Sequence, residues 1–461
     1  MYNSDTIAAI ATGMTNSGIG IIRISGSESF AVAERIFLPA NKNIKIKDAE
    51  SHTIHYGFIK DGEETVDEAM VSVMKSPRSF TTEDTVEINC HGGMLVMNRI
   101  LQLVITNGAR LAEPGEFTKR AFLNGRIDLS EAEAVMDVIS SKNDMALKSS
   151  VGQLRGKVSE KVKQLRSDII YEIAFIESAL DDPEHISLDD YPDKLLIKTD
   201  FLIKTVDNLL QSADSGRIMK EGIKTVIVGK PNAGKSSLLN ILAGEEKAIV
   251  TDIAGTTRDV LEENINLHGI SLNVIDTAGI RDTEDTVEKI GVERARKAAM
   301  DADLIIYVVD ASVPLDGNDQ MIFKMIYDKK SVILLNKTDL PSVIKEDDLL
   351  EMAGKDSVMI RTSTKDATGI DLFENTVKDM FFTGKINPDQ EVVITNMRHK
   401  EALLRTLESL KQVKQSIKNH MPEDFYSIDL MSAYTSLGSI IGEEVSDDLV
   451  NEIFSKFCMG K

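Results

Sequence analysis

The segment 229–236 has the sequence GKPNAGKS, which fits the phosphate-binding pattern G-x-x-x-x-G-K-[ST]. The apolar run 225–228 precedes it and a helical pattern at 237–242 follows, so it has the strand–loop–helix context that the pattern requires. The N–H groups of such a loop and the N-terminus of its helix attract phosphate oxygens. We expect Lys235 to reach the β- and γ-phosphates, as a catalytic residue, and Ser236 to bind Mg²⁺. The residues expected to hold the phosphates are Asn232, Ala233, Gly234, Lys235, Ser236 and Ser237.

Two later motifs identify the base of the bound nucleotide. The sequence NKTD at 336–339 follows the apolar run 332–335, and the Asp339 carboxylate can accept two hydrogen bonds from the N1–H and amino groups of guanine. Adenine offers no such pair, so the motif selects GTP over ATP. The segment 362–364 follows another apolar run and is expected to support the base. The expected base-binding residues are Asn336, Lys337, Asp339, Ser363, Thr364 and Lys365.

Two further segments supply the expected hydrolysis machinery. The motif at 276–279 ends the apolar run 272–275; its aspartate can hold Mg²⁺ through water, and its glycine N–H can sense the γ-phosphate. Ligands of open parallel sheets bind at the carboxyl ends of the strands, so these motifs together predict one site. The loop 251–259 is expected to close on the γ-phosphate, and one of its threonine hydroxyls, with Thr257 as the candidate, completes the Mg²⁺ shell. The candidate residues in the two segments are Thr251, Thr256, Thr257, Asp276, Thr277, Ala278 and Gly279.

The group that orients the attacking water is open from the residues alone. Ile280 stands where Ras-type GTPases carry a water-orienting glutamine, and an aliphatic side chain cannot do this. The following segment offers three candidate carboxylates, or else hydrolysis is very slow. They are Glu284, Asp285 and Glu288. No arginine finger is assignable, and a substitute cation is expected because such a finger accelerates hydrolysis by about 10³–10⁵.

The composition excludes several classes of protein. A net charge of −21 argues against a general nucleic-acid coat, because phosphate contacts dominate such binding. A local basic site stays open at Lys119, Arg120 and Arg126, with a solvated face as the alternative. The two cysteines, Cys90 and Cys458, form neither a disulfide framework nor a zinc site. With no signal peptide and no apolar run of membrane-spanning length, we expect a cytoplasmic protein.

Hydrophobic patterns predict a multidomain α/β + α fold. Short apolar runs at 7–10, 19–24, 53–58, 70–74 and 86–88, with a helix at 94–104, predict a β-rich N-terminal domain over 1–124. Ser130 and Glu133 form a capping box that opens the first helix of a helical part. Helical stripes follow at Val162, Leu165, Ile169, Ile173, Ile176 and Leu180, at Leu202, Val206, Leu209 and Leu210, and at Leu403, Leu404, Leu407, Leu410, Val413 and Ile417. No single stripe can bury itself. We therefore expect one bundle from 125–216 and 384–461, with a Ras-like P-loop G domain inserted at 217–383; two separate helical domains are the alternative.

These motifs carry a resemblance to a known family. The run 229–259, the motif DTAG at 276–279 and the stretch VEKIGVERA at 287–295 closely resemble the MnmE (TrmE) family of tRNA-modification GTPases. The flanks are similar as well: DTIAA at 5–9, GIIRISG at 20–26, PGEF at 114–117, RAFLNG at 120–125 and the terminal CMGK at 458–461. The resemblance covers nearly the whole chain.

The resemblance implies an answer to both gaps in the hydrolysis machinery. Members of the family bind K⁺ in the active site when two G domains pair across the nucleotides. The K⁺ ligands then fall on Asn232, Thr251, Ile253 and Thr256, and the water-orienting acid falls on Glu288. A fixed monovalent cation can replace an arginine finger, because it neutralises charge that develops on the phosphates.

The resemblance also implies folate chemistry. The N-terminal domain is similar to tetrahydrofolate-binding domains, and the folate site falls on Arg23, Glu87 and Arg126, with Lys461 reaching in from the helical part. The implied ligand is 5,10-methylene-tetrahydrofolate or its 5-formyl analogue. The family often has lysine at position 126, so the charge is kept while the geometry differs. Cys458 is a candidate catalytic nucleophile, with a merely packed thiol as the alternative.

The resemblance finally implies partners and a substrate. The chain forms a homodimer through its N-terminal domains and works with an FAD-dependent protein of the MnmG (GidA) type, away from any membrane. Together they place a carboxymethylaminomethyl or aminomethyl group on C5 of the wobble uridine of certain tRNAs. Glycine and ammonium both stay open as the second substrate. A regulatory or ribosome-assembly GTPase switch and a dimeric scaffold with regulatory hydrolysis are the alternative functions.

Overall fold

The computed structural model describes residues 5–242, 244, 262–267, 270–275, 298–354, 356–382, 392–443, 445–458 and 460. The chain divides into two compact units. The first comprises Met1–Met136, Val162–Arg166 and Thr435–Lys461, and the second comprises Asp137–Lys161 and Ser167–Tyr434. The domain boundaries given above, at 124/125, 216/217 and 383/384, stay predictions.

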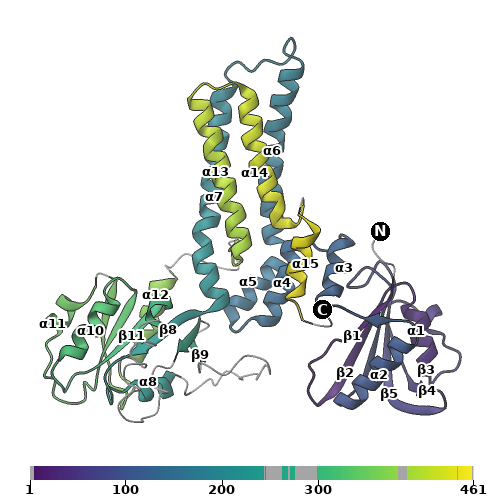
Figure 1. The fold of residues 1–461 in the computed structure, drawn as a ribbon, viewed down its shortest axis with the longest axis horizontal. Coiled ribbons are helices and arrows are strands. Elements are labelled where there is room, and N and C mark those ends of the chain that lie inside the picture. The colour runs from purple at the N-terminus through teal and green to yellow at the C-terminus, as the bar shows by residue number, and fades with distance from the viewer. Residues whose placement is uncertain are drawn as a thin grey trace. The chain divides into compact units, whose positions relative to one another are not determined.

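A seven-stranded sheet organises the first unit. Its strands are β1 (Ile7–Ile10), β2 (Ser17–Ser25), β3 (Phe37–Pro39), β4 (Thr53–Asp61), β5 (Glu64–Met74), β6 (Thr85–Gly92) and β7 (Arg110–Leu111), in the order β3-β4-β5-β6-β2-β1-β7. Neighbouring strands are antiparallel except β1 and β7. Helices α1 (Ser29–Ile36) and α2 (Met94–Thr106) pack on the sheet and bury its apolar side chains (Figure 1). This confirms the predicted β-rich domain.

Three helices of the first unit connect the N-terminal sheet to the end of the chain. They are α3 (Glu116–Leu123), α4 (Leu129–Ser140) and α15 (Asp447–Ser455); a short 3₁₀ helix, η1 (Ile46–Asp48), lies earlier in the same unit. Phe454 and Phe457 pack against Leu129 of α4. The capping box predicted at Ser130 and Glu133 is wrong by two residues. Asp128 caps α4: its Oδ1 accepts from the N–H of Glu131 at 3.1 Å, and the Glu131 carboxylate accepts from the N–H of Asp128 at 2.8 Å.

One helical bundle forms in the second unit. Its helices are α5 (Asp144–Leu154), α6 (Lys157–Asp181), α7 (Tyr191–Glu221), α13 (Met397–Lys418) and α14 (Glu423–Ile441), of which α6 and α14 also enter the first unit. Helix α7 packs along α13 (Figure 1), and Tyr191 Oη donates to Glu172 Oε2 between α6 and α7 at 2.9 Å. Because α7 and α13 come from opposite sides of the insertion, the alternative of two helical domains is wrong.

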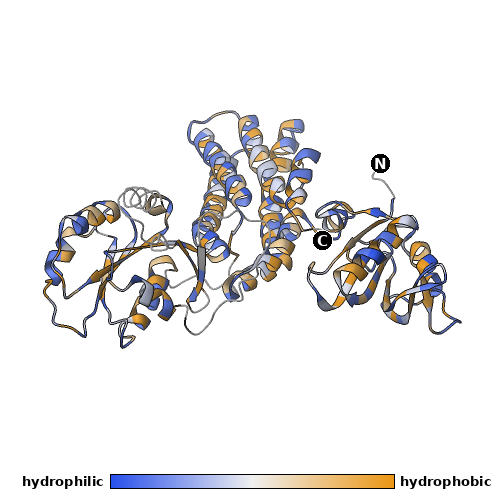
Figure 2. Ribbon diagram, turned by 60° about the horizontal axis from the view of Figure 1, so that its bottom comes forward, coloured by the Kyte–Doolittle hydropathy of each residue, from blue (hydrophilic) through white to orange (hydrophobic). Residues whose placement is uncertain are grey.

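The predicted stripes form the buried faces of these helices, with two exceptions. Leu180, at the end of α6, is 43% exposed, and Leu404 of α13 is 49% exposed. Leu404 directly follows buried Leu403, and adjacent residues of a helix point about 100° apart. Apolar and polar residues share each bundle helix (Figure 2), and no described helix is long and apolar enough to cross a membrane.

A six-stranded sheet forms the inserted part of the second unit. Its strands are β8 (Ile223–Val228), β9 (Glu262–Leu267), β10 (Ile270–Ile275), β11 (Leu304–Asp310), β12 (Ser331–Asn336) and β13 (Ser357–Arg361), in the order β13-β12-β11-β8-β10-β9. All described pairings are parallel except β9 with β10. The described helices are α8 (Lys235–Leu242), α10 (Gly317–Ile326), α11 (Glu346–Met352) and α12 (Ile370–Phe381). Two apolar clusters form around this sheet. The fold is therefore the predicted one: a β-rich N-terminal domain, a helical bundle and an inserted P-loop domain.

Candidate functional site

Three predicted motifs meet at one edge of the second sheet. Strands β8, β11, β12 and β13 are mutually parallel, so their carboxyl ends lie at the same edge. The loop 229–234 leaves β8 there, Asn336 is the last residue of β12, and Ser363 follows β13 by two residues. Ligands of such sheets bind at this edge.

The phosphate-binding loop is folded so closely that glycine is required at Gly234. Its φ is +106°, and a Cβ atom there would lie 2.2 Å from Nδ2 of Asn336. Asn232, in the same loop, has a φ of +59°, a conformation that asparagine tolerates better than most residues. The side chains of Asn232, Ser236 and Ser237 are exposed at the loop and at the start of α8, where a ligand can reach them.

Asn336 joins the phosphate-binding loop to the loop after β13. Its side chain is fully buried. Its Nδ2 donates to the Ala233 carbonyl at 2.8 Å, and its Oδ1 accepts from the N–H of Thr364 at 3.1 Å. Three expected binding segments are therefore fixed to one another by a single amide group.

The two lysines of the loop have different partners. Lys235 Nζ donates to the carbonyls of Gly229 and Lys230, at 2.7 and 2.8 Å, and so lies over the loop that it is expected to serve. Lys230 Nζ pairs instead with Asp319 at 2.7 Å and with Asp316 at 3.1 Å. These two aspartates form the capping box of α10, so Lys230 fastens the loop to that helix.

Burial and hydrogen bonding shift the pKa values of this ion-pair network. Burial lowers the pKa of Lys230, but its hydrogen bonds to Asp319 and Asp316 outweigh burial, and the net pKa is raised. Tyr307 donates to Asp319 at 2.5 Å, and burial followed by this bond raises the pKa of Tyr307. At neutral pH, Lys230 therefore stays protonated and positively charged, and the Tyr307 hydroxyl stays neutral. The sequence analysis missed it because its members lie 77 to 89 positions away from Lys230, at Tyr307, Asp316 and Asp319.

The expected base-binding residues lie together after β12 and β13. Ser363 Oγ donates to Asp339 Oδ1 at 3.2 Å, which orients an otherwise exposed carboxylate. Lys337 pairs with Asp310 at 2.5 Å. Burial raises the pKa of Asp310, but hydrogen bonds from Lys337 and Ser312 outweigh it and leave the pKa below its ordinary value. Lys365, which follows Thr364, is exposed.

A second predicted group converges in the first unit. Arg23 of β2 and Glu87 of β6 are register partners, and Arg23 Nε lies 2.8 Å from Glu87 Oε1. The guanidinium carbon of Arg23 lies 5.9 Å from the centre of the Phe80 ring, and that of Arg126 lies 4.9 Å from the same ring. Arg126 Nη1 also donates to the Phe80 carbonyl at 2.8 Å. We call Arg23, Glu87, Arg126 and Phe80 the ring cluster.

The end of the chain reaches the ring cluster. Arg23 Nη1 donates to the carbonyl of Gly460 at 3.2 Å. Gly460 has a φ of +84°, and a Cβ there would lie 2.4 Å from the carbonyl oxygen of Ile10, so only glycine fits this approach. The Cys458 carbonyl accepts from the N–H of Gly115 at 3.3 Å, while the Cys458 side chain is exposed. The alternative given above, a thiol that is merely packed inside the protein, does not fit this exposure.

The basic cluster predicted at Lys119, Arg120 and Arg126 is corrected by the structure. Arg120 is buried and pairs with Asp5 at 2.9 Å, with Glu116 at 3.0 Å and with Glu83 at 3.1 Å. Three carboxylates around one guanidinium leave no free positive charge. Arg120 therefore links three segments of the first unit through Asp5, Glu83 and Glu116, and it does not contribute to a basic surface.

Comparisons with known proteins show the family to which this chain belongs. A family model described as "MnmE helical domain" matches residues 129–458, and one described as "GTP-binding protein TrmE N-terminus" matches residues 6–126. A "tRNA modification GTPase MnmE" of Lachnoclostridium phytofermentans is 57% identical over 99% of this chain and 100% of that protein. Proteins of the same name from Acetivibrio thermocellus and Listeria welshimeri are 50% and 48% identical, over 100% and 99% of both chains. The chain belongs to the MnmE family of tRNA modification GTPases.

Several residues that the sequence motifs or the MnmE resemblance select lie outside the described part of the structure. They are Thr251, Ile253, Thr256, Thr257, Asp276, Thr277, Ala278, Gly279, Glu288 and Lys461. Their roles stay predictions. The described residues still fit the groups that the MnmE family implies. The exposed loop at Asn232 and the N-terminus of α8 suit a phosphate, and the ring cluster offers an aromatic ring, two guanidinium groups and a carboxylate to a flat polar ring.

Proposed function

We propose that this MnmE-family chain is a K⁺-activated GTPase that modifies tRNA together with an FAD-dependent partner of the MnmG (GidA) type. The product is a carboxymethylaminomethyl or aminomethyl group on C5 of the wobble uridine. The one-carbon unit comes from 5,10-methylene-tetrahydrofolate bound in the first unit of a homodimer. The protein acts in the cytoplasm.

The nucleotide half of the proposal rests on the edge of the second sheet. The loop N–H groups and Lys235 would neutralise the phosphates, and Asp339, oriented by Ser363, would accept hydrogen bonds from guanine. Mg²⁺ bound by Ser236 and Thr257 would supply further neutralisation of phosphate charge. Glu288 would orient the attacking water.

The proposed K⁺ site explains how hydrolysis proceeds without an arginine finger. Asn232 presents an exposed side-chain amide at the phosphate-binding loop, and its oxygen is a suitable ligand for a hard cation. Thr251, Ile253 and Thr256 would supply the remaining oxygen ligands. A cation fixed there would stabilise the charge of the transition state.

The observation that carries the folate half is the convergence of the ring cluster with the chain end. Arg23, Glu87 and Arg126 lie far apart in sequence. Yet Arg23 and Arg126 lie over one phenylalanine ring, Glu87 pairs with Arg23, and Arg23 also donates to Gly460. Donors, an acceptor and an aromatic face in one place suit a flat heterocycle with polar edges. Lys461, next to Gly460, and the exposed Cys458 thiol would complete this site.

Titration calorimetry of the full-length protein with 5-formyl-tetrahydrofolate tests the folate half. The protein should bind this stable analogue, and Glu87→Gln should weaken binding about 10- to 100-fold, because a charge-assisted hydrogen bond contributes roughly 1.5–3 kcal/mol. His91→Gln is the matched control, since His91 lies four positions further along β6 and pairs with Asp67 instead. Absence of binding by the unaltered protein would leave only a GTPase switch or scaffold.

A further inference from the structure

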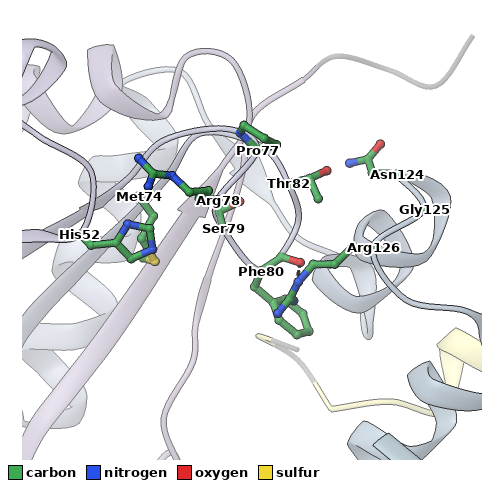
Figure 3. A pocket seen from close by; sticks show the side chains of 10 residues that line it. All are labelled: His52, Met74, Pro77, Arg78, Ser79, Phe80, Thr82, Asn124, Gly125 and Arg126. Atoms are coloured by element: carbon green, nitrogen blue, oxygen red, sulfur yellow. Dashed lines mark hydrogen bonds between the residues drawn. The ribbon is translucent and has the colours of Figure 1, made fainter. Parts of the chain in front are cut away.

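A pocket of about 550 Å³ lies beside the ring cluster in the first unit (Figure 3). Two members of the ring cluster, Phe80 and Arg126, also line this pocket. The full lining is His52, Met74, Pro77, Arg78, Ser79, Phe80, Thr82, Asn124, Gly125 and Arg126. A ligand held by the ring cluster could therefore extend into the pocket without leaving the unit.

The pocket is cationic in a strongly acidic chain. The sequence has 74 acidic residues, yet none lines the pocket, whereas Arg78 and Arg126 both do. Within the described residues, neither of these arginines pairs with a carboxylate. Arg126 donates only to the Phe80 carbonyl, and the Arg78 side chain has no described partner. Arg126 lies within electrostatic range of Glu131, which does not line the pocket, and Arg78 has no such carboxylate among the described residues. Two guanidinium groups that make no direct ion pair favour an anionic ligand.

The two arginines of the pocket lie at opposite ends of it. Arg78 lies beside His52 and Met74 at one end, and Arg126 lies against Phe80 at the other (Figure 3). Apolar side chains of Met74 and Pro77 line it as well. Cations separated by apolar surface suit a chain in which carboxylates alternate with methylene groups, and suit a single compact anion less well.

The walls of the pocket are fixed in advance. Asn124 Nδ2 donates to the Thr81 carbonyl at 2.7 Å, and Ser79 Oγ donates to the Glu83 carbonyl at 2.6 Å. Besides Gly125, two lining residues that are not glycine hold left-handed backbone conformations, His52 with a φ of 65° and Thr82 with a φ of 63°. Such a conformation is costly for a β-branched residue and persists only where the surroundings enforce it. A preformed pocket loses less entropy on binding.

We propose that this pocket binds the oligo-γ-glutamate tail of folate, with Arg78 and Arg126 pairing with its carboxylates. The proposal rests on the folate binding proposed above and names where the rest of that ligand lies. Cellular folates carry such tails, in which each γ-linked glutamate adds one carboxylate and two methylene groups. Arg126 then lies at the junction of the two parts of the site. It stacks on Phe80 of the ring cluster and pairs with the first carboxylates of the tail.

Binding of 5-formyl-tetrahydrofolate with one and with three glutamates to the full-length protein tests this proposal. The triglutamate should bind about threefold to tenfold more tightly, since each added carboxylate gains one partly exposed ion pair. This gain should shrink as salt rises. Arg78→Gln should abolish the gain and leave monoglutamate affinity unchanged. Arg99→Gln, which removes the same charge from an exposed helix position outside the pocket, should keep the gain.

The outcomes separate the two proposals. If neither folate binds, the folate half of the proposed function fails. If both bind equally tightly, the folate site stands and the tail site is refuted. If Arg78→Gln leaves the gain intact but weakens binding of a tRNA anticodon stem-loop, the pocket contacts nucleic-acid phosphates, and the tail site is again refuted.

Discussion

Replacing Asn336 with alanine should destabilise the nucleotide-binding part of the second unit. Asn336 is fully buried, and its amide satisfies the Ala233 carbonyl at 2.8 Å and the Thr364 N–H at 3.1 Å. The substitution leaves both backbone groups without this partner, at about 1–3 kcal/mol each. Water entering the vacated space recovers part of that loss, so we expect roughly 2–4 kcal/mol in all.

Urea unfolding followed by circular dichroism measures this effect. A chain with several units does not unfold in one step, so the relevant transition is the one whose midpoint rises with added GDP. Asn336→Ala should lower that midpoint and weaken GDP binding at least tenfold, about 1.4 kcal/mol. Asn375→Ala, which removes an exposed asparagine of α12, should stay within about 0.5 kcal/mol of the unaltered protein. An equally small effect of Asn336→Ala would refute the role of Asn336 as the connector of the three segments.

The remaining predictions concern hydrolysis, thiol reactivity and pH. Glu288→Ala should keep GTP binding and lose about 10²–10⁴ of the hydrolysis rate, and near-normal turnover would move the water-orienting role elsewhere. Burial raises the pKa of Cys90 to about 11, so a thiol reagent at pH 8 should label only exposed Cys458 in the native protein; rapid labelling of Cys458→Ser would contradict this. The hydrogen bond to Asp67 raises the pKa of His91 above 6.5, so this pair stabilises the fold below that pH and the contribution disappears as pH rises through the raised pKa. Asp67→Asn should return the His91 titration, followed by NMR, toward 6.5, and an unchanged midpoint would contradict the pairing.

The sequence alone predicted the parts of the nucleotide site that are local motifs. The loop around Gly234 and the segment from Asn336 to Asp339 are contiguous, and the parallel sheet places them at one edge. Lys230 gave no such signal, because its partners Asp316 and Asp319 belong to a helix reached only through the tertiary fold. Glu288 and three of the four proposed K⁺ ligands, Thr251, Ile253 and Thr256, lie outside the described residues, and their roles stay predictions.

The ring cluster shows a different limit. Arg23 and Glu87 are 64 positions apart, and only the pairing of β2 with β6 makes them neighbours. Phe80 carried no signal, since one aromatic residue in a loop is ordinary in any sequence. The capping box moved from Ser130 to Asp128 because both residue types cap helices, and local preference does not choose between two candidates so close together.

Steady-state GTP hydrolysis by the full-length protein in K⁺ and in Na⁺, at equal ionic strength, tests the central claim most directly. The account predicts strong activation by K⁺ and its loss in Asn232→Ala, because a cation at the phosphate-binding loop takes the place of an arginine finger. Equal rates in the two salts would contradict the claim and point to a conventional GTPase switch that awaits a separate activating protein.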